Sequence, residues 1–277
     1  MSAPEAWRGV HGQPVALPAE IDITVPSVAR GYDYALGGKN NFEVDRIAAE
    51  ELTKVFPGTV PLALDNRAFL RRGVRYLVAE AGIRQIVDIG SGLPSAGNVH
   101  EIAHEIDPQV RVVYVDIDPI VLAHGRALLA DNNTTTVIQA DAADPRSILD
   151  HPETRQFIHP DEPFAVLMAG ILHHLPDSKD PAGVARYVKE RMSPGSYLLV
   201  SSFLDDDDPR AREMDAKMES VFGTGRFRTW DEHTAYFEGL EMVEPGLVYA
   251  NEWRPDELTD GESEWTTFLS GGIGRKV

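Results

Sequence analysis

The chain has 277 residues, of which 43% are hydrophobic and 25% charged, ordinary values for a globular protein. Its formal net charge is −18, and because an acidic protein repels phosphate groups, nucleic acids and anionic membrane surfaces are disfavoured as partners. The absence of cysteine excludes disulfides, thiolate metal sites and cysteine nucleophiles.

The N-terminal residues show no basic segment followed by an apolar one, as a signal peptide would. No apolar run approaches the ~20 residues that a membrane helix needs. We therefore expect a cytoplasmic protein with a small-molecule partner and no metal site. The oligomeric state stays open between a monomer and a homodimer.

The N-terminal third reads as an arm followed by helices. Residues 1–26 contain several Pro and Gly residues without a sustained period, which is typical of an extended arm. Apolar residues at helical spacing predict a helical segment over 28–56, interrupted at Gly37-Gly38. A second helix is predicted from 62 to 80, where Ala81-Gly82 ends it.

The middle of the chain alternates short apolar strands with helices. This pattern predicts an α/β fold with a Rossmann-like, doubly wound, mostly parallel seven-stranded sheet, helices on both faces and an N-terminal helical cap. The predicted strands are 85–89, 110–115, 134–139, 164–168 and 197–202, and the predicted helices are 99–106, 120–130 and 181–192.

The C-terminal part is predicted to complete the same domain. A helix follows Asp205–Asp208, and Thr229 with Glu232 forms a capping box at the start of another helix. Segments 240–249 and 265–273 are predicted to be final strands at an antiparallel edge. We therefore expect one domain over 27–277, divided into a cap or lid (27–82), a cofactor-binding core (83–204) and a substrate-side part (205–277).

Three acidic residues follow three successive predicted strands. Asp88, Asp116 and Asp141 would meet at one edge of the sheet, where open α/β sheets bind ligands. Gly90 and Gly92 would let the backbone turn tightly beside a ligand. A carboxylate at 116 could accept hydrogen bonds from two ribose hydroxyls, and one at 141 could accept from an adenine amine.

A dinucleotide site is the alternative for this strand edge. Its G-x-G-x-x-G fingerprint would require a third glycine where Ser95 stands, and Pro94 precedes that position. The carboxylate ahead of the glycines would also repel a pyrophosphate, whereas a cationic sulfonium with an ammonium group suits it.

Motifs at these positions resemble those of class I S-adenosylmethionine-dependent methyltransferases. They are VDIGSG at 87–92, YVDIDP at 114–119, QADAADP at 139–145 and LHHLPD at 172–177. More narrowly, the chain resembles the actinobacterial S-adenosyl methyltransferase family through 26–46, 66–77, 88–95 and 239–255. The segment 26–46, which contains GGKNNF, is the most specific of these.

The resemblance implies a role for each matched position. Asp88, Gly90, Ser91 and Gly92 would form the loop on the methionine side; Asp116 would hold the ribose and Ile117 would lie against the adenine; Asp141 and Ala142 would contact the adenine edge; Ala169 and Gly170 would pass beneath the methionine moiety. Asp118 departs from the wider class, where a small polar residue is common, and makes a second candidate for the ribose.

Other residues near the expected methyl group could take part in binding or catalysis. His173 or His174 could deprotonate a hydroxyl acceptor, although packing against the sheet explains either equally well. The segment with Tyr34 could cover the cofactor as a lid. Arg67 could clamp the cofactor carboxylate, and Arg71, four residues on, could instead form a surface ion pair. Trp230, Tyr236 and Phe237 could line an acceptor pocket or pack in the core.

The sequence therefore predicts a methyltransferase that uses S-adenosylmethionine, releases S-adenosylhomocysteine and methylates an oxygen or nitrogen of a small molecule. A non-catalytic sensor or scaffold that binds S-adenosylmethionine is the alternative, because no acceptor motif is visible. A nucleotide-dependent oxidoreductase is disfavoured by Pro94 and Ser95.

Overall fold

The computed structural model describes residues 22–94, 97–128, 133–259 and 263–277, so residues 1–21 of the predicted arm and Ser95 lie outside the described residues. Within these ranges the chain forms an eight-stranded sheet in the order β3-β2-β1-β4-β5-β8-β6, and β7 also pairs with β8. The strands are β1 (Gln85–Ile89), β2 (Arg111–Asp116), β3 (Thr135–Gln139), β4 (Ala165–Ala169), β5 (Tyr197–Phe203), β6 (Glu241–Met242), β7 (Val248–Tyr249) and β8 (Leu269–Arg275).

The first five strands are parallel and β8 runs antiparallel to β5, as the alternating pattern predicted. The C-terminal edge differs from the prediction. The expected strand 240–249 is broken into β6 and β7, because Pro245 between them has no N–H to donate to a strand ladder. β8 begins only at Leu269, since Thr266–Phe268 form a 3-10 turn that packs Trp265 and Phe268 around Phe56.

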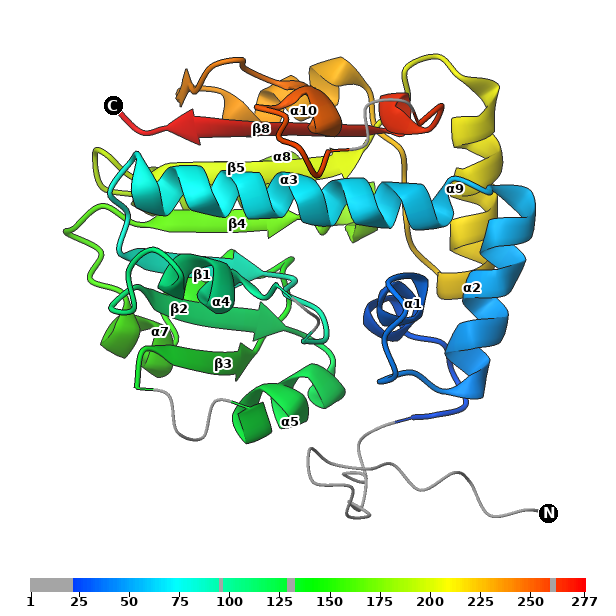
Figure 1. Ribbon diagram of the computed structural model, residues 1–277, viewed down its shortest axis with the longest axis horizontal. Coiled ribbons are helices and arrows are strands. Elements are labelled where there is room, and N and C mark those ends of the chain that lie inside the picture. Colours follow the sequence, from blue (N-terminus) through cyan, green and yellow to red (C-terminus); the bar gives the residue numbers. More distant parts are fainter. Residues whose placement is uncertain (1–21, 95–96, 129–132, 260–262) are drawn as a thin grey trace.

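Helices cover both faces of the sheet (Figure 1). α3 (Thr59–Ala79) and α4 (Val99–His104) share one hydrophobic core with the sheet. The short helices α6 (Pro145–Leu149) and α7 (Pro152–Phe157), with α8 (Pro181–Arg191) and α10 (Trp230–Phe237), border the other core. The predicted capping box of α10 is present, with the Thr229 hydroxyl accepting from the Glu232 N–H.

A helical cap stands beyond the carboxyl ends of the parallel strands. It consists of α1 (Val28–Ala35), α2 (Glu43–Val55) and α9 (Pro209–Phe222), next to α5 (Pro119–Leu128) at the edge of the sheet (Figure 1). α9 comes from the C-terminal part, whereas α3, which the sequence grouped with the cap, lies along the sheet. α3 packs there because its apolar side is buried against β4, β5 and β8, and a Cβ at Gly73 would lie 2.3 Å from Leu199.

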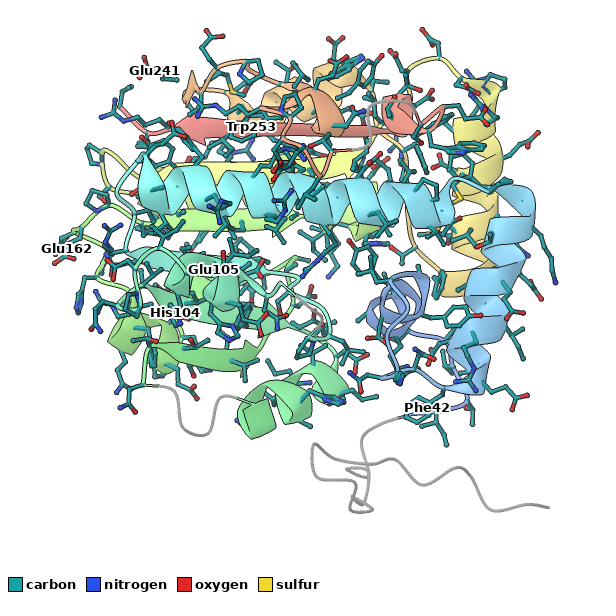
Figure 2. The ribbon with its side chains drawn as sticks, viewed as in Figure 1. Phe42, His104, Glu105, Glu162, Glu241 and Trp253 are labelled. Atoms are coloured by element: carbon teal, nitrogen blue, oxygen red, sulfur yellow. The ribbon has the colours of Figure 1, made fainter. Side chains whose placement is uncertain are left out.

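The core on the α3 side is rich in aromatic residues. Trp253 is completely buried on this side, with its ring centroid 5.6 Å from that of Phe69 in an edge-on contact (Figure 2). Glu162 and Glu241 extend outward from the molecule at the end away from the cap. Among the helices that the structure describes, none combines the length and apolar character that crossing a membrane requires.

Candidate functional site

A cavity of about 580 Å³ lies between the carboxyl ends of the parallel strands and the cap. α1 and the preceding residues 22–27 form part of its wall. All of the predicted binding residues except Tyr34 line it: Arg67, Asp88, Gly90, Ser91, Gly92, Asp116, Ile117, Asp141, Ala142, Ala169 and Gly170. Residues from four strand ends are therefore brought together at one place.

The loop after β1 is held in a tight turn against β2. Gly90 has φ 74° and Gly92 has φ 67°, the left-handed region that glycine tolerates best. The Gly90 N–H donates to the Val115 carbonyl at 2.8 Å, and the Gly92 N–H donates to Oδ2 of Asp116 at 2.8 Å. A Cβ at Gly90 would also lie 2.6 Å from Ile171, so this loop requires glycine for both conformation and space.

The two acids after β2 have different partners. Asp116 accepts the Gly92 N–H on one oxygen and the Asp118 N–H, at 2.9 Å, on the other. Since a carboxylate oxygen can accept two hydrogen bonds, both oxygens keep capacity for a ligand. Asp118 accepts the Ser27 hydroxyl at 2.7 Å and the Ile120 N–H at 2.9 Å, which joins the cap to the start of α5. Asp116 is thus the better placed of the two for a ribose.

Next to these acids the wall offers an apolar surface and a third carboxylate. Ile117 is 62% exposed and lines the cavity, so its apolar side chain is open to a ligand there. Oδ1 of Asp141 accepts the Ala143 N–H at 2.8 Å, which fixes the turn after β3. The arrangement matches the edge and one face of a purine base.

Asp88 is buried at the base of the cavity. Burial raises the pKa of its carboxyl to about 7, although the positive charge of Arg67 acts in the opposite direction. Arg67 lines the same cavity and donates to the Gly97 carbonyl at 2.8 Å. Arg71 instead forms an ion pair with Asp256 at 2.8 Å and takes no part in the wall, so the surface interpretation holds for it.

The two predicted catalytic histidines lie in different surroundings. His173 is buried away from the cofactor cavity; its Nδ1 accepts the Phe203 N–H at 3.3 Å and its ring stacks on that of Phe203. His174 lines the cavity, and its Nδ1 is buried with no hydrogen-bond partner among the described residues. Burial lowers the pKa of both rings, that of His174 to about 4, so both are neutral near pH 7.

Tyr34, the predicted binding residue of α1, does not line the cavity. Its hydroxyl donates to Glu50 at 3.0 Å, outside the wall, and Tyr32 lines the cavity instead. Helical spacing could have indicated Tyr32, because it lies one turn after Val28 and therefore on the same side of α1. Trp230, Tyr236 and Phe237 line neither this cavity nor two smaller ones, and Tyr236 and Phe237 are buried in the core.

Asn66 is a wall residue that the sequence reasoning missed. Its Nδ2 donates to the Tyr32 hydroxyl at 3.1 Å, and its Oδ1 accepts the Ser201 hydroxyl at 2.5 Å. A Cβ at Gly170 would lie 3.0 Å from the same Nδ2. Asn66 thus connects α1, the loop after β4 and β5. Its sequence signal was its place at the start of the family-like segment 66–77, next to Arg67.

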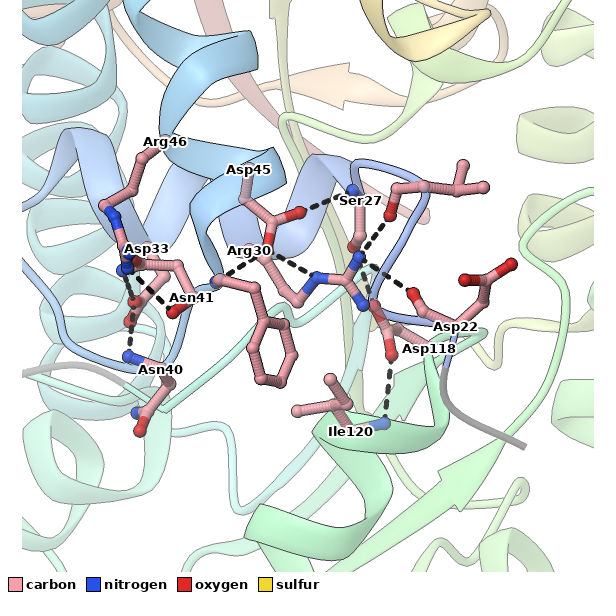
Figure 3. A network of polar contacts seen from close by, with 12 residues as sticks. Asp22, Ser27, Arg30, Asp33, Asn40, Asn41, Asp45, Arg46, Asp118 and Ile120 are labelled. Carbon is pink, nitrogen blue, oxygen red and sulfur yellow. Dashed lines mark hydrogen bonds and ion pairs between the residues drawn. The ribbon is translucent and has the colours of Figure 1, made fainter. Parts of the chain in front are cut away.

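Polar contacts fix the cap in place (Figure 3). Arg30 and Asp45 form a buried ion pair at 2.8 Å, and Asp45 also accepts the backbone N–H groups of Ser27 and Phe42. The Arg30 guanidinium donates to the carbonyls of Asp22 and Val25, which holds the described end of the arm over the cavity. These contacts tie α1, α2 and the residues before α1 to one another.

The glycine-rich segment between α1 and α2 is a structural turn. Asp33 accepts the Asn40 N–H at 2.9 Å and the Asn41 side-chain amide at 2.8 Å. A Cβ at Gly38 would lie 2.1 Å from the Asp33 carboxylate, so only glycine fits. This contact accounts for the glycine at position 38 in structural terms.

The cavity suits an adenosyl group attached to a cationic sulfur. The carboxyl groups of Asp88 and Asp116 lie beside the glycine loop, where a cation would favour their ionised forms, and the buried Ser91 hydroxyl has no hydrogen-bond partner among the described residues. The described part of the chain contains no cluster of three or more metal-binding side chains. Fold and cavity together define a class I S-adenosylmethionine-dependent methyltransferase.

Comparison with known proteins gives the family. Residues 14–277 match the S-adenosyl methyltransferase family, and the chain belongs to it. A crystal structure of a candidate methyltransferase from Thermobifida fusca is 44% identical, with a TM-score of 0.90 over 95% of this chain and 99% of that one. A DUF574 family protein from Streptomyces avermitilis is 38% identical, with a TM-score of 0.85 over 92% of this chain and 99% of that one.

More distant structures share the fold alone. The mitomycin 7-O-methyltransferase MmcR is 17% identical, with a TM-score of 0.53 over 95% of this chain and 76% of that one. No curated protein matches the chain's sequence. The family establishes a methyltransferase whose cofactor is S-adenosylmethionine.

Proposed function

We propose that the cavity holds S-adenosylmethionine with its ribose on Asp116, its adenine between Ile117 and Asp141, and its methionine part along the glycine loop and Gly170. The support is the position of these residues in one cavity wall. Asp88, when ionised, and the loop after β4 would face the charged ammonium and sulfonium groups. Arg67 would pair with the carboxylate of the cofactor.

We further propose that the methyl acceptor is an oxygen or nitrogen of a small molecule. The observation that carries this proposal is the cap: α1 and residues 22–27 cover the cavity and are tied to the core by the Ser27–Asp118 hydrogen bond. A polymer or folded protein would have to displace that cover, whereas a small molecule fits beneath it.

The bound cofactor supplies a methyl group on a positively charged sulfur, which makes that carbon an electrophile. The chain's own residues supply position and a dry environment: Tyr32 and Asn66 hold α1 against the loop after β4, and the cap excludes water. His174 is neutral near pH 7 and can accept a hydrogen bond from the acceptor.

The proposal is tested by incubating the protein with methyl-labelled S-adenosylmethionine and a whole-cell extract of an actinobacterium. We expect label in a species below about 1 kDa, retained when the extract is filtered to remove proteins and nucleic acids. Label found only in the macromolecular fraction would contradict a small-molecule acceptor.

A further inference from the structure

A second cavity adjoins the cofactor cavity behind His174. Its volume is about 70 Å³, and it lies among α1, α2, α3, α9, β5 and the loop after β4. The two cavities share five wall residues: Val28, Tyr32, Asn66, Gly170 and His174. These shared residues also border the position proposed for the methionine part of the cofactor, so the second cavity opens next to the transferable methyl group.

The wall of this second cavity carries no charge. It contains no Asp, Glu, Lys or Arg, and burial lowers the pKa of His173 and His174 so that both rings are neutral near pH 7. Placing an ionised group in such surroundings costs far more than any compensation the wall offers. The occupant must therefore be uncharged.

The interior of the cavity is apolar and adaptable. Met214 and Met218 of α9 line it opposite Leu52 of α2, and methionine side chains adjust to irregular shapes because they have three rotatable bonds. Phe203 adds a ring that stacks between those of His173 and Phe227, at centroid distances of 3.8 and 4.8 Å. Benzene occupies a cavity of roughly 150 Å³, about twice the volume of this one, so a small ring would enter only with a change of rotamer at Met214 or Met218.

Away from the boundary with the cofactor cavity, the polar wall residues are Thr59 and His173, and both are already hydrogen-bonded, to the Phe56 carbonyl and the Phe203 N–H. The other polar wall residues lie at that boundary. Tyr32 and Asn66 are hydrogen-bonded to one another, whereas Nδ1 of His174 has no partner among the described residues. A neutral imidazole has one nitrogen that accepts a hydrogen bond. The donor that complements it is a hydroxyl group attached to an apolar body.

We propose that this second cavity is the acceptor site and that it selects a small, uncharged, aromatic or alicyclic molecule with one hydroxyl group directed at His174. This inference rests on the proposed function of the first cavity. In the reaction, the hydroxyl oxygen forms the bond to the methyl carbon, the carbon–sulfur bond breaks and its electron pair stays on sulfur. The hydroxyl proton passes to the imidazole of His174 and then to solvent. Transfer is downhill even to a ring with a low pKa, because a methylated oxonium is far more acidic.

The first test compares three ring compounds with the protein saturated with S-adenosylhomocysteine. Phenol is neutral at pH 7, whereas benzoate and benzylammonium carry opposite charges on rings of the same size. We expect ligand-detected NMR to show phenol binding at least about tenfold more tightly than either charged compound. The inference is overturned if the three compounds bind equally, or if phenol does not bind at 10 mM. That concentration is on the order of the weakest fragment affinities.

The second test changes the cavity itself. Ala49 is buried and lines only this cavity, so Ala49→Leu should fill it and weaken phenol binding at least about tenfold. Met218→Ala should enlarge it and permit the larger 2-naphthol to bind. The matched control is Met192→Ala, because Met192 is equally buried at 4% exposure but belongs to the opposite core.

Binding of S-adenosylhomocysteine distinguishes a failure of the acceptor-site inference from a failure of the proposed cofactor site. If the unaltered protein binds it but phenol discrimination is absent, the acceptor-site inference alone fails. If S-adenosylhomocysteine does not bind, the proposed cofactor site fails. Should Ala49→Leu not fold, the comparison of Met218→Ala with Met192→Ala still decides, since equal 2-naphthol binding in these two variants overturns the inference.

Discussion

Asp88 shows how the fold sets the charge of a single side chain. An aspartate in water is ionised above pH 4, but burial beneath the glycine loop raises its pKa to about 7. A cationic ligand would favour the ionised form, because it would supply a positive charge to compensate the buried carboxylate. The side chain is therefore matched to a positively charged partner.

The first prediction at this scale concerns pH. The free protein is increasingly protonated at Asp88 as the pH falls below about 7. Because the ammonium group of S-adenosylhomocysteine favours the ionised carboxylate, its affinity should fall about tenfold per pH unit from 7 to 5. Calorimetric titration at several pH values measures this slope. Asp88→Asn should bind weakly at every pH; a slope that persists in this variant would assign the proton to another group.

The second prediction distinguishes the two acids after β2. Asp116→Ala should lower affinity for S-adenosylhomocysteine about 100-fold, because two charge-assisted hydrogen bonds to the ribose are lost. Asp118→Ala should cost about tenfold or less, since Asp118 is already engaged by Ser27 and Ile120. A larger loss at 118 than at 116, by the same titration, would reverse the ribose assignment.

At the scale of elements, one buried ion pair links α1 to α2. The side chains of Arg30 and Asp45 are 4% and 0% exposed, and the same carboxylate also holds the backbone at both helix starts. The cap thus combines this buried charged contact with apolar packing, because Leu52 of α2 and Met214 of α9 belong to the same hydrophobic core as α3.

Removing one member of this pair should be costly. Arg30→Ala leaves a buried carboxylate without its partner, and we expect a loss of about 3–5 kcal/mol in unfolding free energy by chemical denaturation. The exposed pair Arg75–Glu105 is the control, where Arg75→Ala should cost less than about 1 kcal/mol. Similar costs at both positions would show that Asp45 is satisfied without Arg30.

At the scale of the whole molecule, the cofactor cavity joins the cap to the sheet. A ligand there contacts β1, β2, β3, β4 and α1 together, and it binds only the folded protein. Ligand binding should therefore stabilise the entire domain against unfolding.

This stabilisation distinguishes the methyltransferase cofactor from a dinucleotide. S-adenosylhomocysteine at 100 times its dissociation constant should add about 2.7 kcal/mol to the unfolding free energy, which corresponds to roughly 5–10 °C in melting temperature. NAD at the same concentration should leave the melting temperature unchanged in a thermal scan. A comparable shift with NAD would contradict the cofactor assignment.

The sequence by itself determined the parallel sheet and most of the cofactor cavity. Apolar strands of about five residues alternate with helices, and parallel strands end at one edge, so Asp88, Asp116 and Asp141 had to lie near one another. The sequence does not predict the short helices α6 and α7, because five or six residues are too few to show a helical period.

Only the tertiary structure decided which elements form the cap and which side chains face the ligand. α9 joins α1 and α2 although it lies some 150 residues away in the chain, and α3 leaves them for the sheet. The adjacent residues His173 and His174 have the same chemistry, yet one packs on Phe203 and the other borders both cavities. Local periodicity assigns residues to the sides of one element, but which neighbour covers each side depends on packing between segments far apart in sequence.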